Sequence, residues 1–296
     1  MIDILVTGAN GFLGRSIVGE VSQSNSVITL GTSTKNNIIC NLANNVPQFS
    51  FNIDLVIHAA GKAHIVPKSS IEADEFYNVN VNGTFNLLKG LSQKPPKCFV
   101  FISSVSVYGL SEGLNINENQ PLLAIDPYGA SKIKAEKIII DWCRTNNVIL
   151  TILRLPLLVG VNPPGNLGRL IRGIQKGYFF NISSGKNKKS MVIADDVSAF
   201  ILHASRIGGI YNLTDGFHPS FKDLSKAIAT RYRSKLYLDI PLFVAYFLAK
   251  IGDLLGALSP FNSKVLMKMN SELTFDDTLA KQNAGWNPRK VLDFYS

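Results

Sequence analysis

Short apolar runs alternate with longer amphipathic stretches through the first two thirds of the 296-residue chain. The apolar runs are rich in Val, Ile, Leu and Phe, which is typical of buried strands. They predict strands at residues 2–6, 26–30, 55–58, 98–103 and 149–154, and the stretches between them predict helices at residues 11–22, 70–91 and 127–145. Because strands and helices alternate, we expect an α/β fold in which a doubly wound parallel sheet carries helices on both faces.

The alternation ends near residue 160, where a loop with two consecutive prolines follows. Beyond it the sequence predicts a helix at residues 167–176, a strand at residues 191–193 and small, mostly helical elements after residue 211. We therefore predict a sheet domain at residues 1–160, to which residues 190–213 return, and a smaller, mostly helical substrate lobe formed by residues 161–189 and 214–296. A binding site is expected where the two units meet.

Composition and charge narrow the class of protein. Hydrophobic residues make up 46% of the chain and charged residues 17%, which excludes a disordered chain. Cys40, Cys98 and Cys143 have no metal-ligand spacing and no export signal precedes them, so we predict reduced thiols in a cytoplasmic protein without a metal. Nucleic-acid binding needs a concentrated basic face, whereas the lysines and arginines are spread along the chain, so a diphosphate substrate explains the net charge of +9 as well and we expect no nucleic acid.

The stretch at residues 241–258 is the most apolar part of the chain. It contains Lys250 and Asp253, which argue against a membrane-spanning helix. The spacing of its apolar residues predicts a helix that faces the core of the lobe or a subunit contact. A helix that lies on a membrane surface is the alternative, although peripheral membrane contact is not the favoured interpretation.

A glycine-rich turn follows the first predicted strand. It has the pattern T-G-x-x-G-x-x-G, in which Gly8 permits a tight turn, Gly11 lets the backbone approach a pyrophosphate and Gly14 lets helix and strand pack closely. The turn therefore predicts dinucleotide binding at a helix N-terminus. No acidic residue follows the second strand at residues 31–35, and Lys35 is available for a 2′-phosphate, so NADP is slightly favoured over NAD.

Tyr128 and Lys132 stand four residues apart at the start of a predicted helix, so their side chains share one face. A nearby ammonium group is expected to lower the pKa of the tyrosine, which enables proton exchange with a sugar hydroxyl. Ser103, Ser104 and Ser106 lie at the end of the fourth predicted strand, where a serine hydroxyl can hold a reacting oxygen.

These motifs, together with His-Ala-Ala-Gly at residues 58–61, Asn-Val-Asn-Gly-Thr at residues 80–84 and Leu-Arg-Leu-Pro at residues 153–156, resemble the extended short-chain dehydrogenase/reductases. Within them the chain is most similar to the NAD-dependent epimerase/dehydratase branch. The resemblance implies a Rossmann-type sheet and a catalytic triad of Ser104, Tyr128 and Lys132. It assigns cofactor binding to Gly8, Asn10, Gly11, Phe12, Leu13, Gly14, Asn41, Leu42, Ala59, Ala60, Gly61, Asn80, Ser103, Tyr128, Lys132, Pro156 and Leu157.

The resemblance also implies a nucleotide-activated sugar as substrate, of the UDP-N-acetylhexosamine type used in surface-polysaccharide synthesis. The substrate contacts it implies are Ser104, Ser106, Tyr128, Asn166, Leu167 and Lys189. Lys189 stands where an arginine is expected, so a point charge replaces a bidentate phosphate contact. A homodimer is common among proteins of this kind.

Three functions, two of them reactions, are compatible with these residues. The favoured one is a 4-ketoreductase, because the residues after the second strand lean toward NADP. The alternative is a 4-epimerase with tightly bound NAD, on a nucleotide sugar or a lipid-linked sugar. A more distant alternative is an NADP-binding sensor without turnover, which would share the fold but not need Tyr128 and Lys132.

Overall fold

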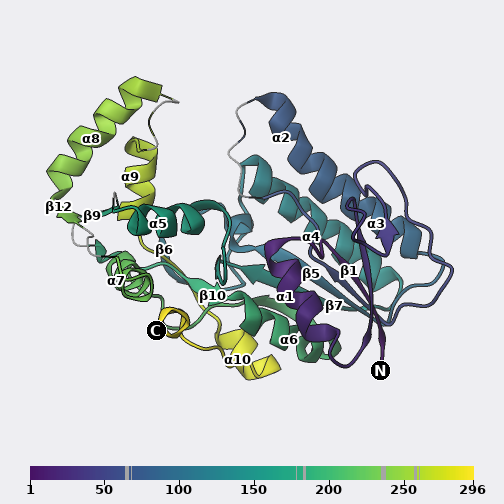
Figure 1. The fold of residues 1–296 in the computed structure, drawn as a ribbon. Helices are drawn as coiled ribbons and strands as arrows, with labels where there is room; N and C mark the ends of the chain where they lie inside the picture. Colours follow the sequence, from purple (N-terminus) through teal and green to yellow (C-terminus); the bar gives the residue numbers. More distant parts are fainter. Residues whose placement is uncertain are drawn as a thin grey trace.

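The computed structural model describes residues 1–63, 67, 69–177, 179–182, 185–234, 238–256, 259 and 261–296. At its centre lies a seven-stranded sheet with the order β11-β7-β5-β4-β1-β2-β3, in which all neighbouring strands are parallel (Figure 1). The strands are β1 (Asp3–Thr7), β2 (Ser26–Gly31), β3 (Ile38–Ile39), β4 (Leu55–His58), β5 (Cys98–Ser104), β7 (Ile149–Leu155) and β11 (Gly209–Asn212). The five predicted strands are confirmed, and two short strands complete the edges.

Helices cover both faces of this sheet, as the alternation predicted. On one face lie α1 (Phe12–Val21) and α6 (Ala194–Ile207), and on the other lie α3 (Gly83–Leu91) and α4 (Pro127–Thr145). Successive strand residues point to opposite faces, so Ile4 packs with the first pair of helices and Leu5 with the second. The doubly wound α/β architecture is thus confirmed.

The single helix predicted at residues 70–91 consists of three parts. Helix α2 (Ser70–Tyr77) leads into a π-helical segment (Asn78–Asn82), and α3 follows. The Thr84 hydroxyl, in the first turn of α3, donates to the carbonyl of Asn80 in this segment at 2.6 Å. A π-helical turn is a local feature inside a continuous helix, and the apolar spacing taken over the whole stretch did not locate it.

The C-terminal part of the chain forms smaller elements around a second core. Its helices are α5 (Gly165–Gln175), α7 (Phe221–Arg231), α8 (Leu242–Leu255) and α9 (Ser263–Asn270), and its parallel strand pairs are β8 (Leu157–Val159) with β10 (Met191–Ile193), β9 (Phe180–Ile182) with β12 (Leu238–Ile240), and β6 (Gly113–Ile116) with β13 (Leu273–Phe275). Helix α10 (Thr278–Ala284) returns to the sheet, where Ala280 and Trp286 join the core beneath α6. The predicted domain boundaries remain a proposal.

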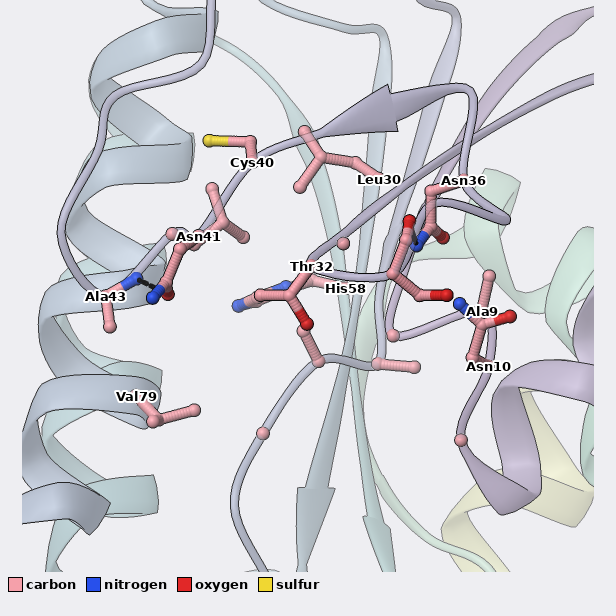
Figure 2. Close-up of a pocket in the computed structure, with 18 residues that line it drawn as sticks. Ala9, Asn10, Leu30, Thr32, Asn36, Cys40, Asn41, Ala43, His58 and Val79 are labelled. Carbon is pink, nitrogen blue, oxygen red and sulfur yellow. Dashed lines mark hydrogen bonds between the residues drawn. The ribbon is translucent and has the colours of Figure 1, made fainter.

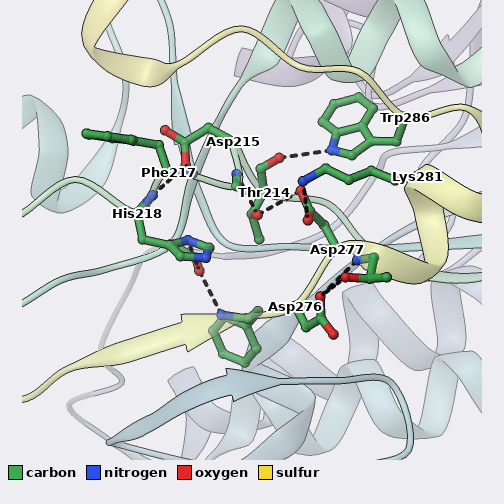
Figure 3. A network of polar contacts seen from close by, with 12 residues as sticks. Thr214, Asp215, Phe217, His218, Asp276, Asp277, Lys281 and Trp286 are labelled. Carbon is green, nitrogen blue, oxygen red and sulfur yellow. Dashed lines mark hydrogen bonds and ion pairs between the residues drawn. The ribbon is translucent and has the colours of Figure 1, made fainter.

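A polar network ties this part of the chain to the end of β11 (Figure 3). The Thr214 hydroxyl donates to Asp277, which also pairs with Lys281 at 2.8 Å. The buried Asp215 carboxylate accepts the backbone N–H groups of Phe217, His218 and Val291. These bonds join segments that are far apart in sequence, and they fix the C-terminal elements against the sheet.

Helix α8 contradicts the prediction of a core-facing helix. Its buried residues are Ala245, Ala249 and Gly252, whereas its large apolar side chains point outward. Small residues lie inward because the helix packs very closely: a Cβ atom on Gly252 would overlap the carbonyl oxygen of Phe261. Residues 257 and 258 of the predicted stretch lie outside the described residues. Across the described ranges, no helix combines the length and hydropathy needed to cross a membrane.

Candidate active site

The glycine-rich turn joins β1 to α1 in a conformation that only glycines allow. Gly8 has φ +73°, and a Cβ atom there would lie 2.6 Å from the backbone nitrogen of Ala60. Gly11 donates its N–H to the carbonyl of Gly8 at 2.9 Å, and a Cβ atom on Gly14 would overlap that same carbonyl oxygen. The turn is therefore closed against the strand, and the helix N-terminus that follows it is of the kind that binds anions through backbone N–H groups.

Replacing Gly14 with alanine is expected to destabilise the protein by about 1–3 kcal/mol, because the added methyl group displaces the turn. Affinity for a dinucleotide should fall with it, by about tenfold or more. Gly19→Ala in the same helix is the matched control, since nothing lies within 4 Å of a Cβ atom there. Urea unfolding and a fluorescence titration with a dinucleotide measure both effects. Equal behaviour of the two variants would contradict this account of the turn.

A cavity of about 270 Å³ lies beside this turn, at the carboxyl ends of β1, β2 and β4 (Figure 2). Strand order reverses between β1 and β4, which is where doubly wound sheets bind their ligands. The described residues that line the cavity are Gly8, Ala9, Asn10, Gly11, Leu30, Gly31, Thr32, Ser33, Asn36, Cys40, Asn41, Leu42, Ala43, His58, Ala59, Ala60, Gly61 and Val79. Eight of the predicted cofactor residues are among them, and none of the lining residues is Asp, Glu, Lys or Arg.

His58 in this lining was not assigned a role from the sequence. Its two ring nitrogens lie 2.6 Å from the Thr7 hydroxyl and 2.9 Å from the Thr84 hydroxyl. Burial lowers the pKa of His58 to about 3, with the positive charge of Lys132 as a second cause, so the ring is neutral. The available signal for His58 was its place at the end of a buried strand, directly before the Ala-Ala-Gly run.

The start of α4 brings the predicted serine and tyrosine together. The Asp126 carboxylate caps the helix by accepting the N–H of Gly129 at 3.0 Å, and Pro127 occupies the first turn. The Tyr128 and Ser104 side chains are hydrogen-bonded to each other. Ser106 donates its N–H to the Ser104 hydroxyl at 3.1 Å, so the predicted substrate contacts Ser104, Ser106 and Tyr128 form one cluster.

Lys132 lies one turn further along α4 and is buried. It donates to the carbonyl of Ile102 at 2.8 Å, and its nitrogen lies 4.5 Å from the centre of the Phe101 ring. Burial lowers the pKa of Lys132 to about 8, against an opposing effect of Glu136. Burial also raises the pKa of Tyr128, and the hydrogen bond from Ser104 only partly opposes that effect. The expected lowering of the Tyr128 pKa by Lys132 is therefore wrong for this structure, because the ammonium group is directed to the Ile102 carbonyl.

The cavity reaches the triad through Gly61. A Cβ atom on Gly61 would lie 3.1 Å from Oδ1 of Asn80 and 3.3 Å from Nζ of Lys132. Asn80 accepts the N–H of Lys62 at 2.7 Å and donates to the Ser131 hydroxyl at 2.8 Å, which links the loop after β4 to α4. Gly61, in the wall of the cavity, thus lies next to Lys132 of the triad and to Asn80.

A buried ion pair behind the triad was missed from the sequence. Arg154 binds Glu136 with two nitrogens, at 2.8 and 3.2 Å, and also donates to the Tyr108 hydroxyl at 3.1 Å. The Ser103 hydroxyl donates to Glu136 at 2.5 Å, so this predicted cofactor residue has its side chain on the carboxylate and outside the cavity lining. Glu136 lies one helical turn after Lys132, which was the available signal.

The remaining predicted residues lie in other surroundings. Phe12 and Leu13 pack against the sheet core, and Leu157 packs against the core of the C-terminal part, directly after Pro156. Asn166 is exposed in the first turn of α5, and the Lys189 ammonium donates to the Ser271 hydroxyl at 3.0 Å. The side chain of Leu167 is buried, so only its backbone is available to a substrate.

A sequence profile of the NAD dependent epimerase/dehydratase family matches residues 4–213. The chain belongs to this family, and it is an enzyme of the extended short-chain dehydrogenase/reductase type with a nicotinamide dinucleotide as cofactor.

Individual relatives agree with this assignment. A UDP-glucose 4-epimerase of Vibrio cholerae is 25% identical over 308 residues, covering 98% of this chain and 92% of that protein. An N-acetyl-alpha-D-glucosaminyl-diphospho-ditrans,octacis-undecaprenol 4-epimerase of Escherichia coli O157:H7 is 36% identical over 128 residues, or 43% of this chain and 38% of that protein. The crystal structure of a UDP-N-acetylglucosamine 4-epimerase from Bacillus cereus has the same fold, with a TM-score of 0.76 at 21% identity over 100% of this chain and 97% of that one.

Proposed function

We propose that this enzyme is an NAD-dependent 4-epimerase of a nucleotide-activated sugar, of the UDP-N-acetylhexosamine type. The observation that carries the proposal is an uncharged cavity at the strand reversal, in contact through Gly61 with the residues around Ser104, Tyr128 and Lys132. The near full-length relative named for UDP-glucose 4-epimerisation supports the reaction. A second relative is named for 4-epimerisation of an undecaprenol-linked sugar, so a lipid-linked sugar is the alternative substrate that we consider for this enzyme. The same relative supports a role in polysaccharide synthesis.

The choice of NAD rests on the charge of the cavity. A 2′-phosphate carries about two negative charges and needs a cation close by, but the residues around β2 that line the cavity are Leu30, Gly31, Thr32, Ser33 and Asn36. The preference for NADP depended on the missing acidic residue and on Lys35 as a partner for the phosphate, but Lys35 is exposed and is not part of the lining. A neutral wall suits the ribose hydroxyls of NAD, while the glycine turn supplies N–H groups for the pyrophosphate.

In the proposed mechanism the side chains of this enzyme hold the sugar in position and transfer a proton. Ser104 donates a hydrogen bond to the oxygen on carbon 4 of the sugar, and Tyr128 takes the proton from that oxygen and later gives it back. Lys132 places its ammonium group behind Gly61, at the end of the cavity next to the triad. A nicotinamide dinucleotide, which the glycine turn and the cavity lining would hold, would supply the hydride chemistry at carbon 4, and inversion there requires that the hydride return to the opposite face of the sugar. We assign the diphosphate to Lys189 and to the backbone N–H groups near Asn166.

The identity of the bound dinucleotide tests the proposal against the 4-ketoreductase. An epimerase recycles one cofactor, so we expect freshly purified protein to release nearly stoichiometric NAD on heat denaturation, detected by mass spectrometry. It should also interconvert UDP-N-acetylglucosamine and UDP-N-acetylgalactosamine without added cofactor. Protein that binds NADPH and consumes it with a 4-keto sugar nucleotide would establish the ketoreductase instead. Tight binding without turnover of any sugar nucleotide would favour the sensor.

A further inference from the structure

The outward face of α8 reverses the usual arrangement of a surface helix. Such a helix normally turns its large apolar residues inward and its polar residues to solvent. In α8 the inward positions hold Ala245, Ala249 and Gly252, spaced four and three residues apart, against α9 and Phe261. The large apolar residues are left on the solvent side.

The centre of this exposed face is a stripe along one side of the helix. Phe243, Phe247 and Leu254 are 74%, 68% and 89% exposed, and Lys250 completes their spacing of four, three and four residues. Exposed Tyr246, Leu248, Ile251 and Leu255 widen the stripe. A contiguous apolar patch of this kind on a protein surface marks a binding site for another apolar surface.

The charge of the surrounding chain identifies the kind of surface. Residues 161–189 and 214–296 hold 17 of the 30 Lys and Arg but only 8 of the 21 Asp and Glu, so they carry the entire net charge of +9. Lys and Arg occur along the whole chain, but in the remaining residues they are balanced by an equal number of Asp and Glu. Helix α8 lies at the outer edge of this basic part, away from the seven-stranded sheet (Figure 1). An anionic surface is attracted to this end of the molecule and not to the other.

We propose that the exposed face of α8, centred on Phe243, Phe247 and Leu254, docks the enzyme onto an anionic lipid bilayer. The aromatic and aliphatic side chains enter the headgroup boundary, and the Lys250 ammonium reaches back to lipid phosphates. A second copy of the chain fits less well, because a symmetric contact through this face would bring two lobes of charge +9 together. The 14 residues of α8 are also only two heptads, too few for a stable coiled-coil seam. This docking does not depend on which sugar the enzyme uses.

Flotation of the full-length protein in a density gradient tests the proposal, because aggregates do not float. We expect the protein to float with vesicles of phosphatidylcholine and phosphatidylglycerol and not with phosphatidylcholine alone, and higher salt should weaken the binding. The variant Phe243→Ser/Phe247→Ser/Leu254→Ser should bind these vesicles at least about tenfold more weakly. Lys250→Glu should weaken binding as well.

A second triple variant serves as the matched control. Ile39→Ser/Ile71→Ser/Phe85→Ser removes three exposed apolar side chains from the other half of the chain and should float like the parent protein. Equal melting temperatures of the parent and the α8 variant establish that folding is intact. The proposal is overturned if the parent does not float with anionic vesicles, or if both triple variants float equally. It is also overturned if light scattering shows a dimer that the α8 substitutions dissociate while vesicle binding is absent.

Discussion

Tyr128→Phe is expected to lower turnover at least about 100-fold, because the phenol is the only proposed group that moves the proton on the oxygen at carbon 4. The ring itself should stay in place, since it packs beside Phe76 with 6.1 Å between centroids. Affinity for NAD should therefore change little, and so should the melting temperature. Steady-state kinetics and a dinucleotide titration of the same preparation separate the two effects.

Tyr77→Phe is the matched control for this substitution. Tyr77 lies at the end of α2, is exposed and has Lys134 4.7 Å from its ring centre, so it too pairs a tyrosine with a lysine. It lies outside the cavity lining, and its loss of a hydroxyl should leave turnover within about twofold. Equal turnover of Tyr128→Phe and the parent protein would remove the proposed mechanism.

The second large effect concerns stability. Arg154→Met should destabilise the protein by about 3–5 kcal/mol, because it leaves the Glu136 carboxylate buried without its cation. Glu136→Gln/Arg154→Met should recover much of that loss, since both charges are then removed. Urea unfolding of the two variants and the parent protein gives the free energies of unfolding.

An exposed pair of the same type provides the comparison. Arg144 and Asp141 are 2.8 Å apart on the surface of α4, and Arg144→Met should change stability by no more than about 1 kcal/mol. If Arg154→Met were as mild as Arg144→Met, the buried pair would not hold α4 against β7 as described. A double variant as unstable as Arg154→Met would point to lost packing rather than an unpaired charge.

Much of the architecture followed from the sequence because the signals were local. The five main strands are short runs rich in apolar residues, and all of them except β2 are mostly buried, which distinguishes them from the amphipathic helices around them. The turn at Gly8, Gly11 and Gly14 also needs only neighbouring residues, since its conformation is set by the absence of side chains. The order of strand, glycine-rich turn and helix was enough to predict the conformation of this turn.

The contacts that each side chain makes in the fold were harder to predict than the residues that belong to the site. Tyr128 and Lys132 share a helix face as their spacing requires, yet the Lys132 ammonium is bound to the Ile102 carbonyl and the pKa of Tyr128 is raised. Ser103 and Ser104 both lie at the end of β5. The Ser103 hydroxyl nevertheless donates to Glu136, because adjacent residues of a strand point to opposite faces of the sheet.

The sequence by itself determined the doubly wound sheet, the glycine turn and the placing of Tyr128 and Lys132 one turn apart on α4, because each depends on residues close together in the chain. Only the tertiary structure decided the partners of Glu136 and Arg154, the neutral wall of the cavity and the outward face of α8. Each of these depends on which distant segments meet: β7 beside α4, β2 beside β1, and Phe261 against Gly252. Apolar spacing reports that a helix has a preferred face, whereas the neighbour that occupies that face is set by the fold.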